Sequence, residues 1–146
     1  MKEKLKVLFL CTGNSCRSQM AEAWARKLKN EIIEPYSAGV EIHGLNLNAV
    51  KVMAEVGIDI SGNKSKHIND FKEIELDVVV TVCGHAHETC PYFPPRCKVV
   101  HVGFDDPPKM AEELAKQGAS DEEQLNCYRK VRDEIKIFIK GLPDNI

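Results

Sequence analysis

The chain has 146 residues, of which 43% are hydrophobic and 29% charged, and its net charge at pH 7 is −2. These are the values of one globular domain, and they exclude a disordered or collagen-like chain. The near-neutral charge argues against a nucleic-acid partner or an anionic membrane surface, and the apolar runs are too short to span a bilayer. We therefore predict a single domain over residues 1–146.

The apolar pattern alternates between short β-branched runs and longer stretches with helical spacing. Strands are predicted for residues 5–10, 31–38, 76–82 and 98–102. Helices are predicted for residues 18–30, for 48–56, and from a capping box of Ser120 and Glu123 to Gly141. This order predicts an α/β fold with a parallel sheet, whose ligands bind at the carboxyl ends of the strands. The loops after Leu10, Val82 and Val102 are the candidate site.

The first of these loops, residues 11–18, has the pattern of an oxyanion cradle with a nucleophile. A tight loop that opens a helix directs backbone N–H groups at one point, and Gly13 and Asn14 tolerate the positive φ that such a loop requires. Arg17 supplies a planar fork for two oxygens of an anion. The same positive field is expected to stabilise the thiolate of Cys11, and Ser18 to donate a hydrogen bond to its sulfur. The alternative is a buried pair of core thiols, Cys11 and Cys16, and for Cys16 that is the better interpretation.

The second loop carries Cys83 and Cys90, two thiols that a hydrolase does not need. They are useful if the second step is thiol–disulfide exchange. A zinc site is the alternative, because His85 and His87 lie between them, but the spacing lacks the usual close cysteine pairs. We therefore expect no metal.

The third loop contains Asp105 and Asp106. A carboxylic acid that faces a bound oxyanion can protonate its leaving oxygen, although an acidic pair in a loop is often a solvated turn or a helix cap.

Residues 7–22 closely resemble the thioredoxin-coupled arsenate reductases, which share the low-molecular-weight tyrosine phosphatase fold. The resemblance continues in residues 36–39, 43–46, 57–61, 82–84 and 103–107. It implies a four-stranded parallel sheet flanked by helices in a single domain.

The resemblance also implies residue roles. Cys11 is the nucleophile, Cys83 and Cys90 are the resolving cysteines, and Asp106 is the acid. The residues implied to hold arsenate, or phosphate and sulfate as mimics, are Thr12, Gly13, Asn14, Ser15, Cys16, Arg17 and Ser18. The implied electron donor is thioredoxin, with no bound cofactor. We expect a cytoplasmic protein, because only four apolar residues precede Cys11 and a secretory leader needs more. We also expect a monomer. Cys97 and Cys127 lie outside the pattern, and Cys127 is expected to have no catalytic role.

Two other functions remain open. The first is a tyrosine phosphatase, although Gln19 stands where the phosphatases carry proline, and Pro108 and Lys109 follow Pro107 where they place tyrosine. We expect slow phosphatase side activity at most. The second is a non-catalytic thiol protein that binds a metal or arsenite.

One position departs from the arsenate reductases. Many of them bind potassium beside the cradle, and Asn14, Glu22 and Ser37 match three of its four ligands. Lys66 stands where the fourth, an aspartate, is expected, and an ammonium repels a cation. The sequence therefore predicts no potassium site, with Lys66 either in the place of the ion or pointing to solvent.

Overall fold

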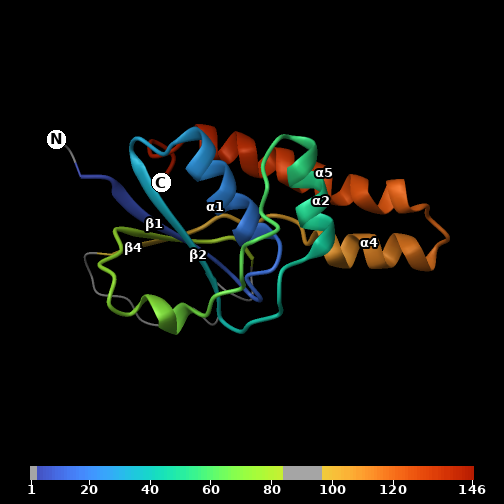
Figure 1. Ribbon diagram of the computed structural model, residues 1–146, viewed down its shortest axis with the longest axis horizontal. Coiled ribbons are helices and arrows are strands. Elements are labelled where there is room, and N and C mark those ends of the chain that lie inside the picture. Colours follow the sequence, from blue (N-terminus) through green and yellow to red (C-terminus); the bar gives the residue numbers. More distant parts are fainter. Residues whose placement is uncertain (1–2, 84–96) are drawn as a thin grey trace.

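The computed structural model describes residues 3–83 and 97–146, so Cys90, His85 and His87 lie outside the described residues. Figure 1 shows the described strands and helices in their order along the chain. They are β1 (Leu5–Cys11), α1 (Arg17–Leu28), β2 (Ile33–Gly39), α2 (Leu47–Glu55), the short 3₁₀ helix η1 (Ile68–Phe71), β3 (Val78–Thr81), β4 (Lys98–His101), α4 (Pro107–Lys116) and α5 (Asp121–Lys140).

The four strands form one parallel sheet in the order β2-β1-β3-β4. This confirms the predicted α/β class and the four-stranded parallel sheet. Leu10 pairs with Ala38 on one side and Thr81 on the other, and Thr81 pairs with His101. Because all strands run the same way, the three loops that carry the candidate residues start from one edge of the sheet.

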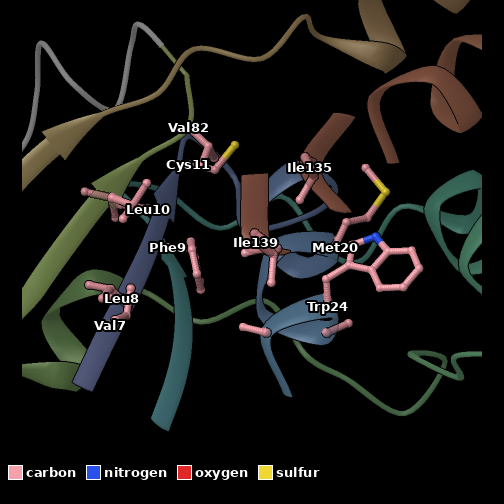
Figure 2. Close-up of a cluster of buried hydrophobic side chains, with 14 of the residues drawn as sticks. Val7, Leu8, Phe9, Leu10, Cys11, Met20, Trp24, Val82, Ile135 and Ile139 are labelled. Atoms are coloured by element: carbon pink, nitrogen blue, oxygen red, sulfur yellow. The ribbon is translucent and has the colours of Figure 1, made fainter. Parts of the chain in front are cut away.

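The sheet is buried through its central strands. Residues 7–10 of β1 and all of β3 are buried, which agrees with their continuous apolar sequences and with a sheet covered on both faces. Phe9 points toward Met20 and Trp24 of α1 and toward Ile139 of α5 (Figure 2). The indole of Trp24 also donates a hydrogen bond of 3.1 Å to the carbonyl of Arg132, which joins α1 to α5.

Two elements were not predicted from the sequence. Helix α4 starts at Pro107, and two prolines in its first turn fit there because the first N–H groups of a helix have no partner within it. Its N-cap is Asp106, so the acidic loop leads directly into a helix. The second is η1, whose turn is closed by a capping box between His67 and Asp70.

No helix among the residues that the structure describes has the length and apolar character needed to cross a membrane.

Candidate active site

The loop between β1 and α1 is built as an anion cradle. The carbonyl groups of this loop face residues 40–46, which follow β2. Backbone N–H groups of that segment donate hydrogen bonds of 2.9–3.2 Å to the carbonyls of Cys11, Thr12, Gly13 and Ser15. In a trans peptide the N–H of the next residue points opposite to the carbonyl. The cradle N–H groups are therefore turned away from this segment and toward the space in front of α1, whose first turn adds its own unpaired N–H groups.

Asn14 adopts the left-handed conformation with a φ of 50°, as the sequence analysis predicted. Gly13 differs from the prediction, because it is not among the glycines with positive φ. Glycine is required at position 13 for a steric reason instead, because a Cβ there would overlap the ring of His43.

Arg17 joins the first loop to the third. Its Nη1 donates a hydrogen bond of 2.9 Å to the carbonyl of Phe104, and its Nη2 lies 3.7 Å from Oδ2 of Asp106. The side chain of Arg17 is only 11% exposed. The third loop therefore holds the guanidinium of Arg17 at the cradle.

The structure separates the two acidic candidates. Asp106 lines the cavity that the cradle opens into, whereas Asp105 pairs with Lys130 of α5 at 3.1 Å on the surface. Only Asp106 is placed to exchange a proton with a bound anion.

Cys83 lies at the cradle, although it is 72 positions after Cys11 in the chain. Its sulfur is 3.2 Å from the hydroxyl of Thr12, and its thiol contacts the thiol of Cys11. This contact raises the pKa of Cys11, and burial raises it further, while Arg17 and the backbone N–H of Thr12 lower it. The expected thiolate-stabilising groups are thus present, but in this arrangement the neighbouring thiol and burial outweigh them.

Asn14 and Ser18 are fully buried behind the cradle. Asn14 Nδ2 donates to Ser18 Oγ at 2.8 Å. The described hydrogen bond of Ser18 therefore involves Asn14 and not the sulfur of Cys11, where the sequence analysis had placed it.

The other described cysteines, Cys16, Cys97 and Cys127, are all buried. Burial raises the pKa of Cys16 to about 12, so Cys16 stays a neutral thiol, as its interpretation as a core residue predicts. Cys97 is buried just before β4, and Cys127 is a buried residue of α5. Within residues 3–83 and 97–146 no group of side chains is suited to hold a metal ion.

A cavity of about 390 Å³ opens over the cradle. One wall is the 43–46 segment and another is formed by Asp106 and Pro108. The wall residues in the described part of the chain include no Phe, Tyr or Trp, so these residues offer a tyrosyl ring no phenyl, phenol or indole surface to pack on. His43 and Gln19 were not predicted as residues of the site, because their contacts with the cradle follow only from the folded arrangement.

Residues 6–146 match the low molecular weight phosphotyrosine protein phosphatase family. The chain belongs to this family.

Within this family the chain is similar to several arsenate reductases. One, from Halalkalibacterium halodurans, is 50% identical over 137 residues, which cover 94% of each chain. Among solved structures, an arsenate reductase in the phosphate binding state is 34% identical with a TM-score of 0.73 and covers 97% of this chain and 98% of its own. An arsenate reductase in the oxidized state is 33% identical with a TM-score of 0.75, covering 96% and 97%.

Proposed function

We propose that this protein reduces arsenate to arsenite through the thiols of Cys11, Cys83 and Cys90, and that thioredoxin reduces the resulting disulfide. The observation that carries the proposal is the position of a second thiol: Cys83 contacts Cys11 inside the anion cradle. Ester hydrolysis has no use for this thiol, whereas a reductase needs one within reach of the first. The relatives point to the same function, since arsenate reductases share half of the aligned residues.

The first step is substitution at arsenic. The cradle amides and Arg17 bind the oxygens of arsenate, and the thiolate of Cys11 attacks arsenic to form a sulfur–arsenic bond. One arsenic–oxygen bond breaks, and Asp106 supplies the proton with which that oxygen leaves as water.

The second step transfers electrons. The thiolate of Cys83 attacks the sulfur of Cys11, and the sulfur–arsenic bond breaks with its electron pair remaining on arsenic. Arsenic(V) becomes arsenic(III), and the two thiols become a Cys11–Cys83 disulfide. Cys90, which lies outside the described residues, then attacks Cys83 and releases Cys11. The dithiol of thioredoxin reduces the Cys83–Cys90 disulfide. We place this reaction in the cytoplasm, in a monomer, where a reducing thiol pool is available.

Phosphatase activity is the second candidate, because Cys11, Arg17 and Asp106 suffice for hydrolysis of a phosphate ester and the family is named for it. The cavity wall without an aromatic residue among the described ones favours only slow turnover of aryl phosphates.

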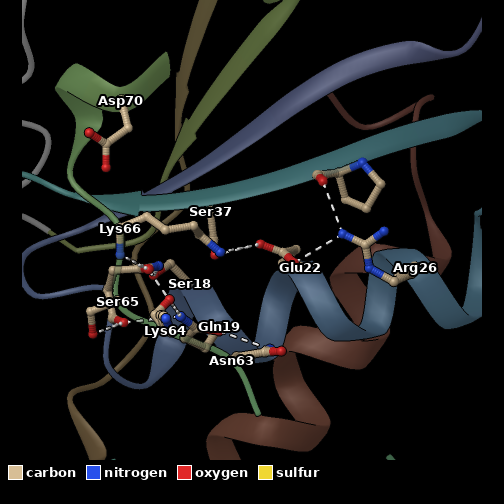
Figure 3. Close-up of polar contacts among 12 residues, drawn as sticks. Ser18, Gln19, Glu22, Arg26, Ser37, Asn63, Lys64, Ser65, Lys66 and Asp70 are labelled. Atoms are coloured by element: carbon tan, nitrogen blue, oxygen red, sulfur yellow. Dashed lines mark hydrogen bonds and ion pairs between the residues drawn. The ribbon is translucent and has the colours of Figure 1, made fainter. Parts of the chain in front are cut away.

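We also propose that the enzyme needs no potassium. Nζ of Lys66 lies 3.2 Å from Oε1 of Glu22, which also accepts a bond of 2.7 Å from Ser37 (Figure 3). The residues do not fit a potassium ion, since Lys66 replaces the expected aspartate and its positive charge faces Glu22, the one carboxylate of the expected ligand set that this chain retains.

The deciding experiment measures arsenite release with thioredoxin, thioredoxin reductase and NADPH, beside hydrolysis of p-nitrophenyl phosphate. We expect Cys11→Ser to abolish both activities. Cys83→Ser and Cys90→Ser should stop multiple turnover of arsenate and leave most of the hydrolysis. Equal loss of both activities in the Cys90 variant would contradict the relay. Fast hydrolysis of p-nitrophenyl phosphate without any reductant would favour a phosphatase.

A further inference from the structure

Asn14 holds an unfavourable backbone conformation at the centre of the cradle. It is the only non-glycine residue with a positive φ among residues 3–83 and 97–146. Asparagine tolerates this conformation better than most residues, but the conformation is still less favourable than the extended and right-handed regions, so contacts that hold it matter. Its consequence is functional, because the turn at Asn14 sets the directions of the N–H groups on either side of it.

The side chain of Gln19 fixes this turn from two sides. Gln19 Nε2 donates to the backbone carbonyl of Asn14 at 3.2 Å and to its side-chain Oδ1 at 3.0 Å. One amide therefore locks the side chain of Asn14 against its own backbone. Gln19 stands on the first turns of α1 and is fully buried, so water does not compete for these bonds.

Gln19 is itself held by a distant part of the chain. Its Nε2 also donates to the carbonyl of Lys64 at 3.0 Å, and its Oε1 accepts from Nδ2 of Asn63 at 3.2 Å (Figure 3). Three acceptors share the two amide hydrogens. A reversed amide would place Oε1 against three oxygens and Nε2 against the donor of Asn63, so the contacts define a single orientation.

The same 63–66 segment also reaches Asn14 directly. Ser65 Oγ donates to the Asn14 carbonyl at 2.9 Å, and the backbone N–H of Lys66 donates to Asn14 Oδ1 at 2.8 Å. Together with Gln19 these contacts form a clamp behind the cradle, on the side away from the cavity.

We infer that Gln19 is a positioning residue that presets the cradle for a tetrahedral oxyanion, with Asn63 acting through it. The inference rests on the proposed function for its substrate, but its direct consequence is affinity for an anion. Loss of Gln19 leaves Asn14 free to relax, and the cradle N–H groups then no longer converge on one point.

The test measures binding of inorganic phosphate by calorimetry, with melting temperature and arsenite release beside it. For Gln19→Leu we expect phosphate affinity to fall by roughly tenfold to 100-fold. Gln124→Leu is the control for the same change of residue away from the cradle, since the side chain of Gln124 of α5 donates a bond of 3.2 Å to the Ala119 carbonyl. It should leave phosphate affinity unchanged.

Asn63 is exposed, so Asn63→Ala tests the inference even if Gln19→Leu fails to fold. We expect Asn63→Ala to weaken phosphate binding roughly threefold, as for one lost hydrogen bond. If Gln19→Leu folds, the double variant should bind phosphate no more weakly than Gln19→Leu alone, because Asn63 acts through Gln19.

Unchanged phosphate affinity in Asn63→Ala or Gln19→Leu would overturn the inference, as would the absence of phosphate binding by the unaltered protein. An unaltered protein that binds phosphate and releases no arsenite would refute the proposed function alone. In that case the variants still decide the role of Gln19 through phosphate binding.

Discussion

The thiol of Cys11 is held by opposing influences, and the strongest of these is a single neighbouring residue. The contact with Cys83 raises the pKa of Cys11 more than burial does, and Arg17 opposes both. Removing Cys83 removes the largest upward contribution. In Cys83→Ala the pKa of Cys11 should therefore fall, and more of Cys11 should be thiolate at any pH below its original pKa.

The measurement is the pH dependence of Cys11 alkylation by iodoacetamide, followed by mass spectrometry of the Cys11 peptide. The midpoint should move to lower pH in Cys83→Ala, and the acidic limb of p-nitrophenyl phosphate hydrolysis should move with it. Cys127→Ala, on the buried side of α5, serves as the control and should leave both midpoints in place. A midpoint that moves upward would mean that Cys83 donates to a Cys11 thiolate instead.

The two neighbouring aspartates provide a matched pair of variants. Asp106→Asn removes the acid that faces the cavity, and we expect kcat for hydrolysis and for arsenate reduction to fall about 100-fold or more. Asp105→Asn breaks only an exposed pair with Lys130, whose contribution to stability is small, and should change kcat less than about twofold. Equal losses in both variants would show that the loop, and not the acid, is what matters.

At the scale of a single element, α5 depends on its first turn. Ser120 Oγ accepts from the backbone N–H of Glu123 at 3.2 Å, and the side chain of Glu123 accepts from the backbone N–H of Ser120 at 3.4 Å. Ser120→Ala should lower the free energy of unfolding by about 1 kcal/mol, because the helix loses one capped N–H group.

Urea unfolding followed by circular dichroism measures this change. Ser120→Asp is the control, since an aspartate also caps a helix and should retain the stability of the original protein. A destabilisation of the same size in both variants would assign the effect to the Ser120 hydroxyl and not to capping. Neither variant should change phosphate binding, because Ser120 has no contact with the cradle among its described hydrogen bonds.

At the scale of the whole molecule, α1, β2 and the 63–66 segment meet where Lys66 pairs with Glu22. Glu22 is 10% exposed and Lys66 32%, so this pair is partly shielded from water. Replacing sodium by potassium in the buffer should change neither the melting temperature nor the KM for arsenate.

Lys66→Asp should create a potassium response, because it replaces the ammonium by an oxygen ligand beside Glu22 and Ser37. Lys64→Asp makes the same change of charge at an exposed neighbour and should create no response. A potassium-specific gain in the original protein would refute the proposal.

The sequence by itself determined the parallel sheet and the residues of the first loop. Continuous apolar runs define β1 and β3 because a strand buried on both faces needs apolar residues at every position. The cradle is likewise local: nucleophile, left-handed Asn14 and Arg17 lie within one loop, so their relative positions follow from the backbone between a strand and a helix. Helix α4 was missed because its prolines were interpreted only as part of a loop, although they also suit the first turn of a helix.

Only the tertiary structure decided how distant segments act on that loop. The contact of Cys83 with Cys11 and Thr12, the approach of Arg17 to Asp106, and the clamp of Gln19 with Asn63 join residues that are far apart in the chain. The physical reason is that a hydrogen bond or a pKa shift depends on distances of about 3 Å, which periodicity and spacing do not specify between elements. The pKa of Cys11 illustrates this. The residues of the loop alone lower this pKa and favour a thiolate, whereas the thiol of Cys83, which follows β3, raises it.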